Sequence, residues 1–313
     1  MEPLEEKKIP RGFYITDPVI NQYRNNLITS FWNAPEIINP TTMEKDREEL
    51  SRMTVEERKF LFNIFYFFLL GDDEVIDYIQ TQVSSRVTDR SLLGHENIKI
   101  ANEEIHSECY SLLLDYLAPL EKEQFILGSF ISSHITAKID WCRSVFKKSA
   151  PLSKVFLTMI IMELLFFSTS FSSIFWFKNI KKSLLGVAGL NEMIARDESQ
   201  HGACYIHVYT QRIVNKLPQH KAHRIISSAC DVECSFARTI TPTTIGMNPN
   251  LLADYAKFVA DDICVKLGYE PIYHVQNPFP FMNEFAFERK VDFFKKKSTQ
   301  YTSFVQEEFV LEN

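Results

Sequence analysis

Two short segments of the chain each place a glutamate three residues before a histidine. They are Glu103-Glu-Ile-His106 and Glu198-Ser-Gln-His201. Residues three apart on an α-helix share a face, so each segment can present a carboxylate and an imidazole to one point. Glu-x-x-His pairs on two helices form part of the ligand set in bundles that hold two metal ions. The pairs alone do not establish such a site, because this spacing also arises by chance in helical proteins.

Two further acids complete a ligand set for two metal ions. Glu163 is the only charged residue in the apolar segment 155–177, so a helix there buries a carboxylate in apolar surroundings. Bound metal ions offset that cost. Asp72 is the matching acid on an earlier helix, and the alternative is that it is a solvated member of the acidic cluster 72–74. Carboxylates and imidazoles without cysteine suit iron or manganese better than structural zinc.

Tyr110 lies on the same helical stripe as the first pair, four residues after His106 and seven after Glu103. Taken alone it is an ordinary core tyrosine. Apolar side chains occupy the equivalent stripes of the other ligand-bearing helices at Phe167, Phe171 and Ile194. If the helices converge on the metals, these side chains wall the phenol ring. An apolar enclosure excludes water, which an oxidised tyrosine requires.

The elements that must position these residues are helical almost throughout. A capping-box signature at Thr54-Val-Glu-Glu57 precedes an apolar-rich run from Phe60 to Ile79. Further helices are predicted at 89–117, 121–146, from Pro151 through 177, and at 190–217, 219–239 and 250–267. A short strand is predicted near Tyr273 to Val275. The pattern favours an all-α bundle with long central helices.

The composition favours a single large domain. The chain has 313 residues, of which 45% are hydrophobic and 13% aromatic, enough to bury a large core. No Gly/Ser-rich linker, fixed-period repeat or low-complexity run marks a boundary. We therefore predict one domain over 1–313, with a helical core at about 15–295 and a flexible C-terminal tail at about 296–313.

Charge and cysteine content limit the partners and the compartment. A net charge of -6 disfavours nucleic acid as a partner. The 6 cysteines form no Cys-x-x-Cys motif, and the charged N-terminus lacks the apolar run of a signal peptide, so we expect a cytoplasmic protein. The segment 155–177 is long enough to cross a membrane. Its serines, threonines and central carboxylate favour instead a helix at the core of a large bundle.

Three of these segments resemble the signature helices of class I ribonucleotide reductase small subunits. They are Glu103 to Tyr110, Glu163 to Trp176 and Ala195 to His201, and the similarity continues in order from about Trp32 to Tyr301. The resemblance implies a ferritin-like di-metal bundle and a ribonucleoside-diphosphate reductase of class Ia. In that family a di-iron centre reacts with O2 to generate and store a tyrosyl radical. The radical passes to a separate large subunit, which reduces ribonucleotides to deoxyribonucleotides.

The resemblance also implies a role for each ligand position. One ion has the ligands Asp72, Glu103 and His106, and the other has Glu163, Glu198 and His201. The family assignment is two iron ions per chain, and the ligand types do not distinguish iron from manganese. The family is also homodimeric, so we expect a homodimer.

Tyr110 becomes the radical site by the same resemblance. Electron and proton pass between it and the partner through a hydrogen-bonded chain that the resemblance places at Trp32, Asp197 and the ligand His106, with Arg196 beside it. Tyr301 relays the radical, and the last residues of the tail dock on the large subunit. An acidic tail with several apolar residues suits a segment that folds on binding.

A few features depart from the family pattern. Glu74 stands near Asp72, where family members usually carry an aliphatic residue, so it either perturbs the site or turns outward. Pro280 replaces a usual acid, and the final residues differ from cellular tails. The N-terminal extension of many cellular enzymes is missing, a compactness that resembles viral, herpesvirus-like small subunits. For a viral protein the expected compartment is the host cytoplasm.

Three other classes of function use the same ligands. Metal storage in a ferritin-like protein would not need Trp32, Tyr301 or the phenyl enclosure. A di-iron oxygenase or desaturase for an apolar substrate would need an open cavity where Phe167 and Phe171 crowd. A non-catalytic paralogue would keep the fold to bind a partner, but all the ligands and Tyr110 are present.

Overall fold

The computed structural model describes residues 12, 14–38, 40–119, 133–145, 149–242 and 245–284. Within these ranges every regular element is a helix and there is no β-strand, which confirms the all-α class. The α-helices are α1 (Pro18–Thr29), α2 (Ala34–Ile37), α3 (Pro40–Ser51), α4 (Val55–Tyr78), α5 (Arg90–Leu117), α7 (Ser133–Val145), α8 (Leu152–Ile160), α9 (Ser168–Trp176), α10 (Leu185–His207), α11 (Gln219–Ile240) and α12 (Pro249–Lys266). Wider π-helical turns continue several of them at η1 (Ile79–Ser84), η2 (Ile161–Phe166), η3 (Phe177–Lys181) and η4 (Val208–Arg212), and a 3-10 turn follows at η6 (Pro280–Glu284).

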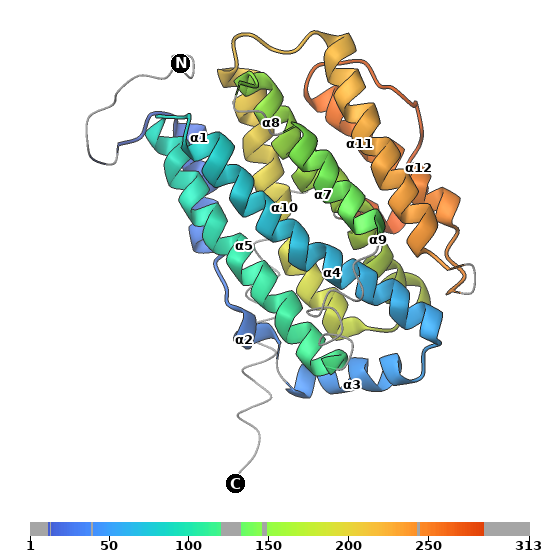
Figure 1. Ribbon diagram of the computed structural model, residues 1–313. Coiled ribbons are helices and arrows are strands. Elements are labelled where there is room, and N and C mark those ends of the chain that lie inside the picture. Colours follow the sequence, from blue (N-terminus) through green and yellow to red (C-terminus); the bar gives the residue numbers. More distant parts are fainter. Residues whose placement is uncertain are drawn as a thin grey trace.

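The long helices run alongside one another as a bundle (Figure 1). α4 and α5 are antiparallel neighbours, and α10 packs against α5, α8 and α9. α11 and α12 pack against each other on the side of the bundle away from α5, and α3 lies across one end. The long helices therefore surround one shared interior.

The helix that carries the second Glu-x-x-His pair begins earlier than the sequence predicts, at Leu185. The reason lies in α3, whose Asp46 accepts a hydrogen bond of 2.6 Å from the Val187 N–H and whose Glu49 accepts one of 2.7 Å from the Leu184 N–H. Carboxylates at a helix N-terminus satisfy its free N–H groups and complement its dipole. The predicted continuation to residue 217 also ends early, because α10 passes into η4 and stops at Arg212.

The predicted capping box at the start of α4 is confirmed. Thr54 Oγ1 accepts a hydrogen bond of 3.2 Å from the Glu57 N–H, and Glu57 Oε2 accepts one of 2.8 Å from the Thr54 N–H. The helix then continues unbroken to Tyr78, which places Asp72 in its last two turns.

The apolar segment forms a rod from α8 through η2, α9 and η3. Its stretch Leu152–Lys181 is long and apolar enough to cross a membrane, and its most apolar window is entirely buried among the other helices. The wide turn η2 interrupts the rod and carries Glu163. Such turns add one residue to a helix and often accompany functional residues.

The strand predicted near Tyr273 to Val275 is wrong. The N–H groups of Ile272, Tyr273 and Val275 donate to the carboxylate of Asp261 on α12, at 2.7, 2.8 and 3.2 Å. His274 between them has a left-handed backbone with φ 54. Because the donors are taken by one side chain, the segment folds around Asp261 and does not pair with another strand.

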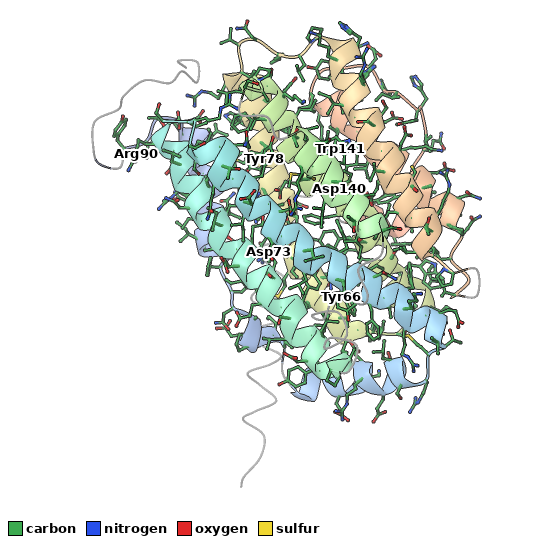
Figure 2. The ribbon with its side chains drawn as sticks, in the orientation of Figure 1. Tyr66, Asp73, Tyr78, Arg90, Asp140 and Trp141 are labelled. Carbon is green, nitrogen blue, oxygen red and sulfur yellow. The ribbon has the colours of Figure 1, made fainter. Side chains whose placement is uncertain are left out.

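One continuous cluster of buried apolar side chains joins the described helices. Side chains fill the spaces between the ribbons, and the exposed Asp73 and Asp140 mark the outer faces of α4 and α7 (Figure 2). The expectation of a single domain over 1–313 stays a prediction, and the tail at 296–313 lies outside the described residues.

Candidate metal centre

Six side chains with metal-binding groups meet inside the bundle. α4 supplies Asp72, α5 supplies Glu103 and His106, η2 supplies Glu163, and α10 supplies Glu198 and His201. All of them are buried. The structure therefore brings together the whole predicted ligand set, from four segments far apart in the sequence.

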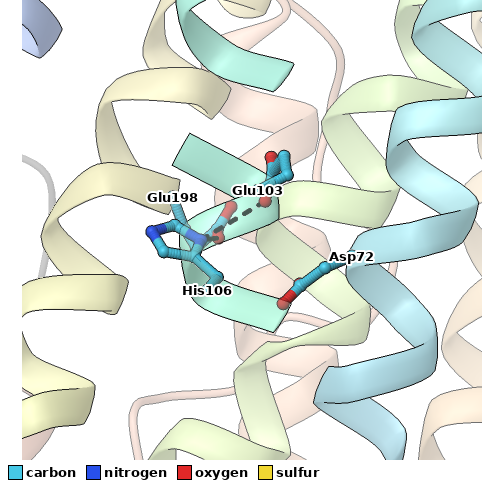
Figure 3. A group of neighbouring side chains, drawn as sticks. All are labelled: Asp72, Glu103, His106 and Glu198. Carbon is cyan, nitrogen blue, oxygen red and sulfur yellow. Dashed lines mark ion pairs between the residues drawn. The ribbon is translucent and has the colours of Figure 1, made fainter. Parts of the chain in front are cut away.

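The ligand atoms fall into two overlapping groups. Asp72, Glu103, His106 and Glu198 form one group (Figure 3), and Glu103, Glu163, Glu198 and His201 form the other. Within each group one atom per residue lies within 4.8 Å of all the others. Glu103 and Glu198 belong to both groups, so they lie where carboxylates can bridge two ions.

Asp72 is the clearest sign that the site needs cations. Its side chain is buried, whereas its neighbour Asp73 is exposed. Neither carboxylate oxygen of Asp72 has a hydrogen-bond partner among the described residues. A buried carboxylate without partners is costly, and a bound metal ion removes that cost. The alternative of a solvated acidic cluster therefore does not apply to Asp72.

The electrostatics of the acids lead to the same conclusion. Burial raises the pKa of Asp72 well above its ordinary value, and the charge of Glu103 raises it further. Burial also raises the pKa of Glu163 to about 8, against the lowering effect of the Lys99 ammonium. Against the effect of burial, Lys99 and the two histidines instead lower the pKa of Glu103, and the histidines lower that of Glu198, so Asp72 and Glu163 are the acids that further positive charge would help to ionise.

The two ring nitrogens of His106 face different groups. Nδ1 lies 2.9 Å from Glu198 Oε1 and 3.3 Å from Glu103 Oε2, on the metal side of the ring. Nε2 lies 3.6 Å from Asp197 Oδ2 on the other side. A carboxylate behind a ligand histidine fixes the ring and its tautomer.

Asp197 connects this histidine to Trp32. The indole N–H of Trp32 donates to Asp197 Oδ2 at 2.7 Å, and Arg196 Nε donates to Asp197 Oδ1 at 2.9 Å. Burial alone would raise the pKa of Asp197, but Arg196, His106 and Trp32 outweigh burial and lower it. The structure thus assembles the chain Trp32, Asp197 and His106, with Arg196 beside it, and keeps its carboxylate charged.

Tyr110 is fully buried beside the site. Its hydroxyl donates a hydrogen bond of 2.7 Å to Asn191 Oδ1 on α10. Its ring stacks on Phe68, with centroids 4.7 Å apart and an interplanar angle of 2°. Burial raises the pKa of Tyr110 well above its ordinary value, and the charge of Asp72 adds to the increase.

The side chains predicted to wall the Tyr110 ring, at Phe167, Phe171 and Ile194, are all buried, and the first two contact Phe68, which stacks on Tyr110. Phe167 and Phe171 contact the Phe68 ring with centroid distances of 5.5 and 4.8 Å. Ile194 is buried on α10, one turn after Asn191. Sequence reasoning missed Phe68 and Asn191, although both share a helical face with a ligand, Phe68 four residues before Asp72 and Asn191 seven before Glu198.

Lys99 is a further residue that sequence reasoning missed. Its ammonium lies 2.5 Å from Glu163 Oε1 and 3.3 Å from Glu103 Oε1, and its side chain is fully buried. The only signal in the sequence is its position four residues before Glu103. A lysine at that spacing ordinarily forms a solvent-exposed pair with its glutamate.

Glu74 turns away from the ligands and toward α7. It forms an ion pair with Arg143 on α7, and it belongs to neither group of metal-binding atoms. Tyr301 and the predicted docking tail lie outside the described residues.

Known proteins resemble this chain in sequence and in fold. The family model described as "Ribonucleotide reductase, small chain" matches residues 12–278. The ribonucleoside-diphosphate reductase subunit M2 of Danio rerio is 33% identical over 279 residues, which cover 87% of this chain and 70% of that protein. Among solved structures, the Rnr4 homodimer of Saccharomyces cerevisiae has a TM-score of 0.78 and 22% identity, over 95% of this chain and 91% of that one. The dimanganese(II)-NrdF of Streptococcus sanguinis has a TM-score of 0.73 and 17% identity, over 89% of this chain and 99% of that one.

The fold and the ligand geometry define a ferritin-like di-metal carboxylate protein. Within that class, the chain belongs to the family of ribonucleotide reductase small chains. It is the radical-generating small subunit of a ribonucleoside-diphosphate reductase, whose family role is to form a tyrosyl radical and pass it to a large subunit. The family, the fold class and this function are confirmed as the sequence predicted them.

Proposed function

We propose that the centre holds two iron ions and that the enzyme is of class Ia. Asp72, Glu103 and His106 would hold one ion and Glu163, Glu198 and His201 the other, and Glu103 and Glu198 belong to both groups of ligand atoms. The observation that carries the metal site is the buried carboxylate of Asp72, both of whose oxygens are free for a cation, and the choice of iron and of class Ia rests on the family. Two ions of this kind supply the oxidising power when they react with O2.

Tyr110 is the radical site in this proposal. Its hydroxyl donates to Asn191 Oδ1, which fixes the position of the phenol. The amide oxygen of Asn191 is not basic enough to take up the phenol proton. Phe68 covers the ring face, and Phe167 and Phe171 extend the apolar wall. The wall excludes water and hydrogen donors, which protects an oxidised phenol.

The row of Trp32, Asp197 and His106 carries the electron and proton toward the large subunit. Asp197 Oδ2 accepts from the indole N–H and lies 3.6 Å from His106 Nε2, so a single carboxylate oxygen lies between the indole and the imidazole. Arg196 also donates to the carbonyl oxygen of Ser30 at 3.1 Å, which fixes the segment before Trp32. Arg196 is therefore a positioning residue for the chain.

The choice between iron and manganese is open to direct test. The ligand set accepts both ions, and the solved relative from Streptococcus sanguinis is a dimanganese protein. The metal-free chain would be loaded with Fe(II) without oxygen and then exposed to air. We expect two ions per chain and a tyrosyl signal in electron paramagnetic resonance, which Tyr110→Phe should abolish while it keeps its iron. Loading with Mn(II) in parallel identifies the productive ion, and an identical signal in Tyr110→Phe would refute the radical assignment.

The partners belong to the same proposal. The chain forms a homodimer, as the solved Saccharomyces cerevisiae relative does, and its tail with Tyr301 docks on the large subunit in the cytoplasm. Sedimentation of the purified chain tests the dimer. Removal of residues 296–313 should abolish binding to the large subunit and leave metal loading unchanged. A truncated chain that still binds would show that the docking surface lies elsewhere.

A further inference from the structure

A lysine lies among the metal-binding carboxylates. Lys99 Nζ is 2.5 Å from Glu163 Oε1 and 3.3 Å from Glu103 Oε1, and none of these three side chains is exposed. A fully buried ammonium is costly unless anions surround it, and here Glu163 and Glu103 stabilise its charge. Lys99 is neither a proposed metal ligand nor part of the proposed radical path.

The surroundings hold the ammonium in place. One turn earlier on α5, Glu96 accepts a hydrogen bond of 2.6 Å from the Tyr205 hydroxyl, and its other oxygen lies 3.1 Å from His95 Nδ1. The Lys99 ammonium lies 4.9 Å from the centre of the Tyr205 ring, a cation–π distance. Glu96, Lys99 and Tyr205 are fully buried, so the ammonium has no route to solvent without repacking these helices.

The contact changes what Glu163 can offer to a metal. Oε1 is occupied by Lys99, whereas Oε2 is buried without a hydrogen bond. Only Oε2 is left to bind an ion as long as the lysine contact persists. His201 Nδ1 lies 3.4 Å from that same oxygen, so Oε2 already faces the second group of ligands.

The two metal positions are therefore unequal in charge. The ammonium lies nearer to the position bounded by Glu163 and His201, at 2.5 Å from Glu163 against 3.3 Å from Glu103, which belongs to both groups. It repels a divalent ion there and reduces the donor strength of Glu163. Asp72, at the other position, has no cation within ion-pair distance among the described residues. Two similar ligand sets are thus made different by one residue that is not a ligand.

We propose that Lys99 is a positioning residue of the metal centre that restricts Glu163 to one ligating oxygen and makes the Glu163–His201 position the weaker of the two. This inference rests on the proposed di-metal function. The Asp72–His106 position fills first, and the second ion binds only at a higher metal concentration.

Titration of the metal-free full chain with Mn(II) tests the proposal, with free Mn(II) followed by its paramagnetic resonance signal. The wild-type chain should bind two ions with affinities that differ by about tenfold or more. Lys99→Met should tighten the weaker ion by a similar factor and bring the two affinities together. His201→Ala identifies the position, because it should lose the weaker ion and keep the tighter one.

Further variants separate charge from packing. Lys99→Arg keeps the charge and should retain unequal binding, whereas Lys99→Gln keeps a hydrogen-bond donor without charge and should behave like Lys99→Met. Lys138→Met is the matched control, because it removes another fully buried ammonium, which pairs with Glu233 at 2.7 Å and forms no ion pair with any of the six ligands. It should leave both affinities unchanged, and circular dichroism verifies that each variant keeps its helices.

The outcomes are distinguishable. Equal affinities in the wild-type chain, or unchanged affinities in both Lys99→Met and Lys99→Gln, would overturn the role of Lys99 and leave the di-metal function intact. Loss of the tighter ion in His201→Ala would also overturn it. A wild-type chain that binds no divalent ion would overturn the di-metal function and the role of Lys99 together.

Discussion

The hydroxyl of Tyr110 on α5 points at the side-chain carbonyl of Asn191 on α10, 2.7 Å away. The amide is itself anchored, because Asn191 Nδ2 donates to the Val187 carbonyl oxygen at 2.9 Å. Asn191 therefore cannot rotate freely, and its carbonyl oxygen fixes the direction of the phenol O–H bond. The orientation of the tyrosine is set by a helix that also carries two of the metal ligands.

We expect Asn191→Ala to leave both metal positions filled and to reduce the yield and lifetime of the Tyr110 radical. The phenol would lose its only described hydrogen-bond acceptor, and a buried unpaired hydroxyl costs on the order of 1–3 kcal/mol of unfolding free energy. Urea unfolding measures that cost, and paramagnetic resonance after aerobic loading measures the radical. A variant with wild-type radical yield and lifetime would show that the amide has no part in holding the phenol.

Trp32→Phe should separate radical formation from its use. The indole N–H that donates to Asp197 is lost, so nucleotide reduction by the two-subunit enzyme should fall by roughly 100-fold or more, as for loss of a proton-transfer group. Metal content should not change. Trp141→Phe is the matched control, because that indole bonds to Ser228 on α11 and not to the site. Equal activity in the two variants would contradict the path.

Removal of the metals should destabilise the fold. The carboxylates that meet at the site repel one another without cations, and a ligand that binds only the folded chain stabilises it by mass action. We expect chelation to lower the midpoint of thermal unfolding by several degrees or more, and added Fe(II) or Mn(II) to restore it. A buried acid whose folded pKa is raised costs stability above its unfolded pKa, and Asp72→Asn removes this acid, so the metal-free variant should unfold at a higher temperature than the metal-free wild type.

Asp17, whose side chain caps the N-terminus of α1, should make the stability of the fold depend on pH. Burial alone would raise the pKa of Asp17, but bonds from the Ile20 N–H, Arg212 and His207 outweigh it and lower the pKa below the ordinary 3.8. An acid with a lowered folded pKa stabilises the fold above its unfolded pKa and loses that effect as the pH falls through the folded value. Asp17→Asn should therefore be less stable than the wild type at pH 6, and the difference should shrink steadily below pH 4. A difference independent of pH would mean that the charge of Asp17 is not the source of the stabilisation.

Most of the ligand set could be predicted from the sequence because it depends on local rules. The spacing of Glu103 and His106 fixes a shared helical face, and the lone charge of Glu163 in an apolar segment marks a buried acid. Both signals depend only on residues within one segment and not on its contacts with other segments. The family resemblance then supplied Trp32 and Asp197, and the structure shows their hydrogen bond.

The features that were missed depend on contacts between distant segments. Lys99 and Glu103 form a familiar surface pattern, and only the approach of Glu163 from η2 shows that the lysine is buried. The start of α10 depends on Asp46 of α3, and the absent strand on Asp261 of α12. In the last two cases one carboxylate determines the path of a backbone segment outside its own helix.

The wide turn η2 also has a consequence for how this sequence can change. Each residue of an α-helix rotates the next by about 100°, so one added residue turns everything after it to another face. Glu163 lies within the wide turn and Phe171 lies beyond it on α9. The wide turn holds one residue more than an α-helical turn, so it takes up this rotation locally and leaves α9 facing the radical site. A one-residue deletion within η2 can therefore be absorbed by closing the turn to α-helical spacing, whereas the same deletion at the start of α9 would turn Phe171 to another face.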